Sequence, residues 1–506
     1  MTLALTQSVA LLGLDGHVVT VEVDIADGLP GYSLLGLPDA ALSESRDRVR
    51  SAIVNCGEVW PNRKVTVSLS PAWLPKSGSS FDLAICIALL SAHETVPTER
   101  ISEVVFLGEL SLDGKIRSVR GVLPALMAAY KAGVTMAVVP AANVEEAQLM
   151  QGMEIIPMHH LKQVLRWLRT GEREVEQQID LQWQPSDERL DFADVAGQPA
   201  ARLAAEIAAV GGHHILLIGP PGAGKTMIAE RIPTIMPALS IAQALEVTAV
   251  HSIAGTLTQR SPLSLLAPMV SPHHTTTRIA MVGGGSHAIK PGACSLAHYG
   301  VLFIDEAPEC GPGVLDALRQ PLESGTITIA RSVGNLTFPA QFLLVLAANP
   351  CPCGKFTGRG HNCTCTSQQV RRYLGKLSGP LMDRIDLRVQ VEPVGRVDMA
   401  KTQLGESSAV IRERVIKARS IAAKRFEGMG WSLNSQIPAR ALRAEFQPER
   451  TAMNFLHDEL DREHITARGL HKIIRTSWSF ADLNGHKVPT MEDVLAAHTM
   501  RGKVEA

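Results

Sequence analysis

The sequence predicts an α/β protein of several domains with a helical C-terminal part, and three observations support this prediction. The chain has 506 residues, more than the roughly 250–300 residues that a single hydrophobic core supports. Short strands alternate with helical stretches up to about residue 393, which is the pattern of α/β domains. Beyond about residue 401 the periodicity is helical.

The composition excludes several classes of protein. Lys plus Arg number 49 and Asp plus Glu number 50, so neither a uniformly basic nucleic-acid coat nor an acidic solvating chain is expected. A hydrophobic share of 45% argues against disorder, and 4% aromatic residues argue against a single-strand binder built on stacked rings. No apolar run approaches the ~18–20 residues of a membrane span, and Met1–Ala4 lacks the basic start of a signal peptide. We therefore expect a soluble, cytoplasmic protein with no membrane partner.

Residues 1–170 are expected to form one α/β domain, followed by a linker at 171–191. The linker carries seven acidic residues against two arginines, which is typical of an exposed segment. The alternative for its first half is the solvated face of a helix. In the domain itself, residue alternation predicts strands and apolar spacing predicts helices. The expected strands are 18–25, 65–69 and 104–107, and the expected helices are 41–55 and 123–131.

The next unit, 192–393, begins with a candidate phosphate-binding loop. The apolar strand 215–218 runs into a G-x-x-x-x-G-K-T sequence, and a helix follows directly. The glycines let backbone N–H groups close around phosphates, Lys225 is expected to reach the β- and γ-phosphates, and the Thr226 hydroxyl is placed to bind Mg²⁺. The expected ATP-binding residues of the loop are Gly219, Pro220, Pro221, Gly222, Ala223, Gly224, Lys225 and Thr226.

Two carboxylates, Asp305 and Glu306, follow the apolar strand 301–304. They come at the C-terminal end of that strand, which is where parallel sheets of α/β proteins place their ligands. Asp305 is expected in the Mg²⁺ shell, and Glu306 is expected to polarise the attacking water.

Asn349 and Arg384 complete a recognisable set. Asn349 ends a third apolar strand, 342–348, and can orient water from the side opposite Glu306; Arg384 follows a turn within 379–386. Together with the phosphate loop and the carboxylates, these residues resemble the AAA+ superfamily of P-loop ATPases. The resemblance implies that Asn349 is sensor 1 and that Arg384 is an arginine finger reaching the γ-phosphate on a neighbouring subunit. Such a finger is worth roughly 10³–10⁵ in rate.

Two further segments fit the same superfamily. Arg468, at the start of a helix, resembles sensor 2, which implies that it touches phosphate in cis. The segment 194–198 resembles the part that lines the adenine pocket. For Arg384 and Arg468 the alternative reading is a surface ion pair.

The residues that precede the strands 301–304 and 342–348 indicate which group of the superfamily the chain resembles. The segment 271–298 forms an insertion, and 326–331 with 335–340 predict a β-hairpin turning at 332–334. This layout resembles the helix-2-insert, pre-sensor-1-hairpin group, which includes magnesium chelatase and replicative helicases. From Val21 to about Ala481 the chain resembles the YifB/ComM family of magnesium-chelatase-like ATPases. That resemblance implies a hexameric DNA branch-migration motor that acts on recombination intermediates during natural transformation.

A ring follows from the same reasoning, because an ATP site that needs Arg384 from a neighbour requires a second copy. The insert and the hairpin would then project toward a central pore, with branched or single-stranded DNA as the partner. Lys290 in the insert and Arg331 at the hairpin tip are the candidate phosphate contacts. Such contacts would be independent of sequence and sensitive to salt. The alternative is that each is a solvated surface charge.

The C-terminal part, 394–506, is expected to be a helical lid on the ATPase core. A basic helix at 411–426 carries six lysines and arginines. Further helices are expected at 448–460, 467–481 and 491–500.

The N-terminal domain resembles Lon-type Ser–Lys proteases in the loop 74–82, where Ser80 falls on the nucleophile position. A Ser–Lys dyad needs an amine of lowered pKa to take the hydroxyl proton. The segments 108–112 and 119–124 match the next block as well, but its lysine position holds Leu123, and leucine cannot act as a base. We therefore expect a Lon-like fold without proteolysis, which docks a partner, DNA or the ring itself.

The eight cysteines divide into two groups. Four are scattered and are expected in the core, namely Cys56, Cys86, Cys294 and Cys310. The other four form two C-x-C pairs, Cys351 with Cys353 and Cys363 with Cys365. Two thiol pairs can fill a tetrahedral Zn²⁺ shell, so structural Zn²⁺ is expected beside ATP and Mg²⁺. Reduced thiols or a redox pair are the alternative.

Four functions compete at this point. The first is an ATP-driven DNA motor, and the second is a motor subunit of a metal chelatase. Chelatase partners carry a D-x-S-x-S motif, and none occurs in this chain. The third, a Lon-like protease, fails at Leu123, and the fourth is an ATPase that remodels a protein.

Overall fold

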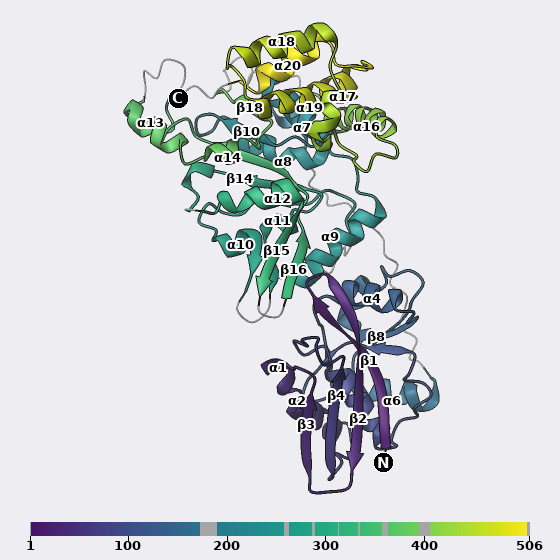
Figure 1. Ribbon diagram of the computed structural model, residues 1–506. Helices are drawn as coiled ribbons and strands as arrows, with labels where there is room; N and C mark the ends of the chain where they lie inside the picture. Colours follow the sequence, from purple (N-terminus) through teal and green to yellow (C-terminus); the bar gives the residue numbers. More distant parts are fainter. Residues whose placement is uncertain are drawn as a thin grey trace.

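The computed structural model describes residues 2–172, 190–257, 263–285, 289–311, 313–331, 334–356, 363–393 and 405–502. The N-terminal sheet forms one end of the molecule, a parallel sheet lies in the middle, and the C-terminal helices form the other end (Figure 1). The expected linker at 171–191 lies mostly outside the described residues, as do residues 394–404.

The N-terminal part is a mixed seven-stranded sheet in the order β3-β4-β2-β1-β5-β8-β9. β1 and β2 pair antiparallel over their whole length, whereas β5, β8 and β9 run parallel. The strands expected at 18–25, 65–69 and 104–107 correspond to β2, β4 and β5. The bounds are β1 (Thr2–Leu12), β2 (Asp15–Ala26), β3 (Gly31–Leu35), β4 (Lys64–Ser70), β5 (Val104–Phe106), β8 (Met136–Pro140) and β9 (Glu154–Met158), with a short β6 (Glu109–Leu110) and β7 (Ile116–Arg117) beside them.

Helices pack on this sheet and complete its core. Every residue of α3 is buried, which explains why its sequence is apolar on all sides. The helix expected at 41–55 is divided at Glu44, because the Asp39 side chain caps a separate first turn by accepting a hydrogen bond from the Leu42 N–H at 2.8 Å. The bounds are α1 (Ala40–Ser43), α2 (Ser45–Asn55), α3 (Asp82–Ala92), α4 (Val122–Lys131), α5 (Val144–Ala147) and α6 (Leu161–Thr170).

The central sheet has five parallel strands in the order β11-β14-β17-β10-β18. Alternate residues of β10 belong to different cores, Ile215 and Leu217 on one face and Leu216 and Ile218 on the other. Burial on both faces explains why the strands are continuous apolar runs. Their bounds are β10 (Ile215–Ile218), β11 (Met269–Val270), β14 (Val301–Ile304), β17 (Leu343–Ala348) and β18 (Leu387–Gln390).

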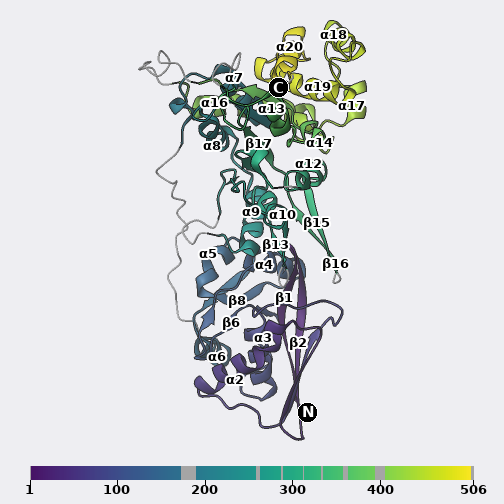
Figure 2. The same cartoon turned by 90° about the vertical axis from the view of Figure 1, so that its left-hand side faces the viewer.

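Helices surround this sheet, and a hairpin extends from it. The hairpin expected over 326–340 is present, with β15 and β16 paired antiparallel from Thr326–Pro339 to Arg331–Gly334. It reaches from the central sheet toward the N-terminal part (Figure 2). The bounds are α7 (Pro199–Gly211), α8 (Lys225–Ile235), α9 (Ile241–Ala254), α10 (Arg278–Val282), β12 (Gly283–Gly284), β13 (Lys290–Pro291), α11 (Ala293–Leu296), α12 (Arg319–Ser324), β15 (Thr326–Arg331), β16 (Gly334–Pro339), α13 (Ser367–Leu374) and α14 (Gly379–Met382).

The C-terminal helices share one hydrophobic core with α7 and α8, to which Phe426, Phe446 and Trp478 contribute. None of the helices in the described ranges has the length and apolar character that crossing a membrane requires. The bounds are α16 (Ser408–Arg425), α17 (Ala439–Ala444), α18 (Arg450–Asp461), α19 (Ala467–Asn484) and α20 (Met491–Met500).

The basic helix α16 directs all four of its arginines toward the protein. Arg414 pairs with Glu206 at 2.7 Å, and Arg425 pairs with Asp482 at 2.6 Å. Arg412 and Arg419 donate to the carbonyl oxygens of Thr234 and Ala209. Burial lowers the pKa of Arg419 to about 10. These contacts attach α16 to the core, so four of its six cationic side chains are not a free basic surface.

Candidate nucleotide-binding site

The loop from Gly219 to Gly224 joins β10 to α8, and its glycines are required for different physical reasons. Gly222 and Gly224 have φ angles of 75° and 93°, which other residues adopt at a cost. Gly219 is needed for space, because a Cβ there would lie 2.1 Å from the carbonyl oxygen of Val391. The loop therefore presses against the end of β18 and opens at the N-terminus of α8, where N–H groups and the helix dipole favour phosphate.

Lys225, the first residue of α8, directs its ammonium back into the loop. Its Nζ donates to the carbonyl oxygens of Gly219 at 2.7 Å and Pro220 at 3.0 Å, and to Oδ1 of Asn349 at 3.1 Å. Burial lowers the pKa of Lys225, and the carboxylates of Asp305 and Glu306 oppose this shift. The structure thus brings Lys225 and Asn349 together from strands β10 and β17, which are neighbours in the sheet.

Thr226 and Asp305 meet beside the loop. The Thr226 hydroxyl donates to Oδ2 of Asp305 over 3.0 Å, and the Glu306 N–H donates to the other carboxylate oxygen at 2.8 Å. A hydroxyl and a carboxylate are the hard oxygen donors that Mg²⁺ prefers, together with phosphate oxygens. Thr226 and Asp305 would therefore be the residues that hold a magnesium ion here.

Glu306 occupies an unusual backbone position and has a partner that the sequence did not indicate. Its φ angle is 49°, a left-handed conformation that costs energy for a residue with a side chain. Its Oε2 lies 3.2 Å from Nδ1 of His274, which follows β11, the strand next to β14. The sequence shows a histidine pair in the insertion but nothing that relates it to Glu306. The two rings are tilted by 34° with their centroids 4.1 Å apart.

The segment 194–198 lies against the same loop. Gln198, with a φ angle of 57°, donates from its side chain to the carbonyl oxygens of Ala223, at 3.1 Å, and Glu392. Asp194 is anchored by Arg231 of α8 at 2.9 Å. The segment is thereby fixed beside the phosphate loop, and its expected part in an adenine pocket stays a prediction.

Arg384 and Arg468 lie at the other edge of the sheet. Arg384 precedes β18, and the neighbouring Asp386 N–H donates to the carbonyl oxygen of His214, just before β10 starts. The phosphate loop follows the end of β10, so the two locations are separated by four strand residues, roughly 13 Å. Arg468 lies with Arg384, its Nη1 3.5 Å from Oδ2 of Asp383. The expected contact of Arg468 with a phosphate on its own chain is therefore not what this arrangement offers.

Arg384 itself is paired within the chain. Its guanidinium donates to the Glu323 carboxylate of α12 and, over 2.7 Å, to the carbonyl oxygen of Pro380. Both arginines line a cleft of about 660 Å³ with Glu323, Asp383 and Lys472. No local sequence pattern relates Glu323 to Arg384, which are 61 residues apart.

The four clustered cysteines converge directly after Asn349. Their sulfur atoms all lie within 4.8 Å of one another; Cys351 is 3.3 Å from Cys353, and Cys363 is 3.6 Å from each. Hydrogen bonds from the backbone N–H groups of Lys355 and Thr364 lower the pKa of Cys353. The expected ligands are thus brought together, and the arrangement could hold a metal ion. His361, between the pairs, lies outside the described residues.

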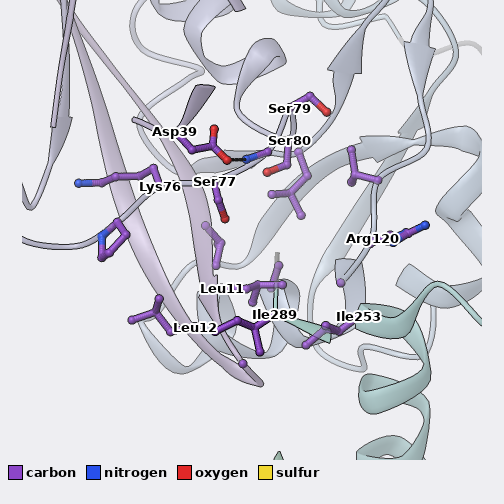
Figure 3. A pocket seen from close by; sticks show the side chains of 18 of the residues that line it. Leu11, Leu12, Asp39, Lys76, Ser77, Ser79, Ser80, Arg120, Ile253 and Ile289 are labelled. Carbon is purple, nitrogen blue, oxygen red and sulfur yellow. Dashed lines mark hydrogen bonds between the residues drawn. The ribbon is translucent and has the colours of Figure 1, made fainter. Parts of the chain in front are cut away.

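A second cleft, of about 1070 Å³, separates the Lon-like loop from the insert and hairpin. Ser77 and Ser80 line one wall, and Leu11, Leu12 and Ile289 line the other (Figure 3). The exposed Lys290 borders this cleft with Asn335 of the hairpin. For Arg331 only the backbone is described, so its expected phosphate contact lies outside the described part.

Neither Leu123 nor Lys76 offers Ser80 a general base. Leu123 is fully buried, and its N–H donates to Oε1 of Glu146 at 2.7 Å. Lys76 is also buried, but its ammonium donates to the carbonyl oxygens of Leu69, at 2.8 Å, and Pro71, and it points away from Ser80 (Figure 3). Neither residue forms a dyad with Ser80 in the described part of the chain, and the expected lack of proteolysis stays a prediction.

Glu146 also joins the N-terminal part to the central unit, because it accepts a hydrogen bond from the Ser252 hydroxyl of α9. Burial raises the pKa of Glu146, and its hydrogen bonds oppose this shift. Glu146 therefore contacts both Leu123, at the position that would carry a protease lysine, and Ser252 of the central unit.

Comparison with protein families covers most of the chain. Residues 191–399 match the family described as "Magnesium chelatase, subunit ChlI", residues 21–143 match "Subunit ChlI of Mg-chelatase", and residues 405–501 match "Magnesium chelatase, subunit ChlI C-terminal". Family membership suggests ATPase activity with ATP and Mg²⁺, which agrees with the donor set at Thr226 and Asp305.

Individual relatives align over almost their whole length. An uncharacterized protein of Mycobacterium tuberculosis is 48% identical over 501 residues, 99% of each chain. Competence protein ComM of Haemophilus influenzae is 37% identical over 96% of this chain and 95% of its own length. The uncharacterized protein YifB of Escherichia coli is 38% identical over 99% of this chain and 97% of its own.

A partial likeness concerns proteases. Lon protease 1 of Myxococcus xanthus is 27% identical over 165 residues, 30% of this chain and 20% of that protein. This weak match covers less than a third of the chain and agrees with a Lon-like part in it. The family models and the full-length relatives together identify the chain as a member of the YifB/ComM family of magnesium-chelatase-like AAA+ proteins.

Proposed function

We propose that this protein is the subunit of an ATP-hydrolysing ring motor of the ComM type, which branch-migrates DNA in recombination intermediates. The observation that carries the proposal is the division of the ATP machinery between two edges of one sheet. Lys225, Thr226 and Asp305 meet at the C-terminal edge, whereas Arg384 and Arg468 lie at the N-terminal edge. A finger that cannot reach its own nucleotide serves a neighbouring copy, so a closed ring of identical subunits, as in a hexamer, completes each site.

Each residue has a role in this proposal. Glu306 is the base that polarises the attacking water, Asn349 orients that water, and Lys225 binds the β- and γ-phosphates. Arg384 and Arg468 stabilise the charge that develops on the neighbour's γ-phosphate. Thr226 and Asp305 would hold Mg²⁺, which when bound neutralises phosphate charge.

The DNA contacts are assigned to the insert and the hairpin. Lys290 is exposed on β13, beside the hairpin, and Arg331 is the last residue of β15. In a ring both would face the pore and contact the backbone phosphates of DNA without reading sequence. We propose that the chain divides into a Lon-like domain at 1–170, a linker at 171–191, an AAA+ core at 192–393 and a helical lid at 394–506.

The test compares ATPase rates with and without branched and single-stranded DNA, together with branch migration of a synthetic junction. Wild type should be stimulated by DNA, and Glu306→Gln should bind ATP but hydrolyse it at least about 100-fold more slowly. Glu309→Gln, an exposed acid paired with Lys376, is the matched control. ATP hydrolysis without any DNA response would instead favour a protein-remodelling or chelatase-like ATPase.

We also propose that the cysteine cluster holds structural Zn²⁺. A tetrahedral ZnS₄ site with bonds of about 2.3 Å places its sulfurs about 3.8 Å apart. The sulfurs of Cys351, Cys353 and Cys363 are 3.3–3.6 Å apart, which is close to that spacing. A Cβ at Gly354 would lie 2.6 Å from Cδ of Pro221, so this zinc loop packs directly on the phosphate loop.

Zinc content measured by elemental analysis tests this second proposal. Purified wild type should contain about one zinc per chain, and Cys351→Ser should lose it. Cys310→Ser, outside the cluster, is the control. Unchanged zinc in Cys351→Ser, or none in wild type prepared with zinc, would contradict the site.

A further inference from the structure

The loop that carries Arg384, residues 383–386 between α14 and β18, is held by cations of the C-terminal helices. Nζ of Lys472, on α19, donates to the carbonyl oxygen of Arg384 at 3.1 Å. Nη1 of Arg501, after α20, donates to the carbonyl oxygen of Ile385 at 2.6 Å. With Arg468 on Asp383, three consecutive loop residues are bound by three cations of one helical unit.

These three contacts differ in strength. The side chains of Arg468 and Asp383 are 68% and 43% exposed. Water and salt therefore screen this ion pair, and it contributes little to holding the loop. Lys472 is 17% exposed and its partner Asp386 is fully buried. An ion pair removed from water in this way is costly to break by removal of one partner. The firm connection between lid and loop is therefore Lys472.

Lys472 binds both ends of the segment that follows the arginine. Its ammonium lies 2.8 Å from Oδ1 of Asp386 and also donates the hydrogen bond to the Arg384 carbonyl oxygen. Oδ2 of Asp386 in turn accepts a hydrogen bond from the His214 N–H at 3.0 Å, next to the start of β10. Burial alone would raise the pKa of Asp386, but the charge of Lys472 keeps it below its ordinary value, so the carboxylate stays charged at neutral pH.

We propose that Lys472 is a positioning residue for Arg384: it fixes the finger loop to helix α19 and to the parallel sheet, so that the guanidinium is presented to the nucleotide of the next subunit. This inference rests on the proposed function, because it assumes that Arg384 acts across a subunit boundary. Small displacements of a catalytic group of about 1 Å can lower rates about 100-fold, and the peptide that Lys472 holds is that of the arginine itself.

In this proposal the position of the helical lid influences ATP hydrolysis, because Lys472 of α19 holds the loop of Arg384. Helix α19 packs in the core shared with α7 and α8, the helix that starts at Lys225. A shift of α19 when nucleotide binds at α8 would move the Arg384 carbonyl through Lys472. Each subunit would then adjust its finger for its neighbour according to its own nucleotide.

The experiment measures ATPase rates of variants and of mixed rings. Lys472→Met keeps the length of the side chain without its charge, and it should lower kcat at least 10-fold with an ATP Kd within twofold of wild type. Because this variant leaves Asp386 buried and unpaired, the double variant Lys472→Met/Asp386→Asn removes both charges and guards against misfolding. Lys472→Arg should retain most activity, and Lys424→Met, an exposed lysine of α16, is the control.

Mixed rings separate positioning from a general structural role. Lys472→Met and Glu306→Gln subunits, co-expressed with different tags and purified on both, should hydrolyse ATP faster than either variant alone. In a randomly mixed ring about a quarter of the sites join an intact base to an intact neighbouring finger. Arg384→Ala mixed with Glu306→Gln is the reference for a finger that acts across the boundary.

The outcomes are distinct. Recovery in both mixtures supports the inference. Recovery with Arg384→Ala but not with Lys472→Met or its double variant overturns it, because Lys472 would then act on its own subunit. No recovery with Arg384→Ala overturns the shared ATP site of the proposed function, and the inference with it. Wild-type activity of Lys472→Met overturns the inference alone.

Discussion

Nδ1 of His274 lies 3.2 Å from Oε2 of Glu306, so the carboxylate proposed to activate water is bound by a side chain of the insertion. Glu306 has a left-handed backbone, and its orientation depends on such contacts. His274 follows β11, at the base of the segment that leads to β12, β13 and the cleft. The pairing connects the candidate DNA-contacting elements to the candidate base.

From this pairing we predict that His274→Ala raises the ATPase rate without DNA by up to about fivefold, since a net hydrogen bond of about 1 kcal/mol no longer restrains Glu306. The stimulation by DNA should shrink accordingly. Steady-state ATPase assays with and without a DNA junction measure both. His273→Ala, which removes the adjacent ring, is the control, and a fall in basal rate for His274→Ala would contradict a restraining role.

Thr226→Val should abolish most of the Mg²⁺-dependent hydrolysis, by about 100-fold. The substitution keeps the shape of the side chain and removes the hydroxyl that donates to Asp305 at 3.0 Å. Thr226 is exposed, so the melting temperature should change little. Titration with Mg²⁺ should show a weaker apparent affinity for the metal with ATP present; an unchanged titration would remove Thr226 from the metal shell.

The C-terminal edge of the sheet was predictable, because the ends of neighbouring parallel strands meet by topology alone. Every position is apolar in the segments 215–218, 301–304 and 342–348, which precede Lys225, Asp305 and Asn349. That pattern is typical of strands buried on both faces of a parallel sheet. Once the three strands are neighbours, their polar ends converge. The contacts of Lys225 with Asn349 and of Thr226 with Asp305 follow.

The location of Arg468 was not predictable in the same way. The location depends on the surface against which α19 packs. The apolar face of a helix indicates that this face is buried, but not which element covers it. Here α19 shares a core with α7 and α16, which carries Arg468 to the edge of the sheet opposite the phosphate loop. The pairs His274–Glu306 and Arg384–Glu323 likewise join residues far apart in sequence and leave no local signal.

The two histidines before β10 predict a loss of stability in acid. Burial lowers the pKa of His213 and of His214 to about 4, against the opposing pull of Asp386. Nδ1 of His214 accepts a hydrogen bond from the Leu344 N–H at 3.1 Å, which only a neutral ring can do.

A histidine that is harder to protonate in the folded protein than in the unfolded chain makes the folded protein less stable in acid. The folded histidines have lower pKa values than the ordinary 6.5 of the unfolded chain, so their contribution is complete above pH 6.5 and is lost as the pH falls toward 4. Between pH 7.5 and 5 the free energy of unfolding should fall by about 2 kcal/mol for each histidine. Urea unfolding at several pH values checks this. His214→Gln should be less stable at pH 7.5 but should lose less on acidification, and equal slopes would refute the assignment.

We predict that the protein does not cleave peptides and that Ser80 is unreactive. Leu123 occupies the position of the base, and the ammonium of Lys76 is held by the carbonyl oxygens of Leu69 and Pro71. A serine-directed fluorophosphonate should leave the protein unlabelled, and Ser80→Ala should hydrolyse ATP at the wild-type rate. Labelling that disappears in Ser80→Ala would show that another group activates this serine.

Glu323→Gln should make the finger easier to recruit. In the isolated chain the Glu323 carboxylate binds the guanidinium of Arg384, and this pair must open before Arg384 can reach a neighbour's nucleotide. Glu323 is 63% exposed, so the pair is worth at most about 1 kcal/mol, and the protein concentration at half-maximal ATPase rate should fall by no more than about fivefold. The effect should vanish at 0.5 M salt, because screening weakens the pair in wild type as well. Gln320 lies one helical turn before Glu323 on α12, and Gln320→Ala is the control; a rise in the half-maximal concentration for Glu323→Gln would mean that Glu323 orients Arg384 for catalysis instead of restraining it.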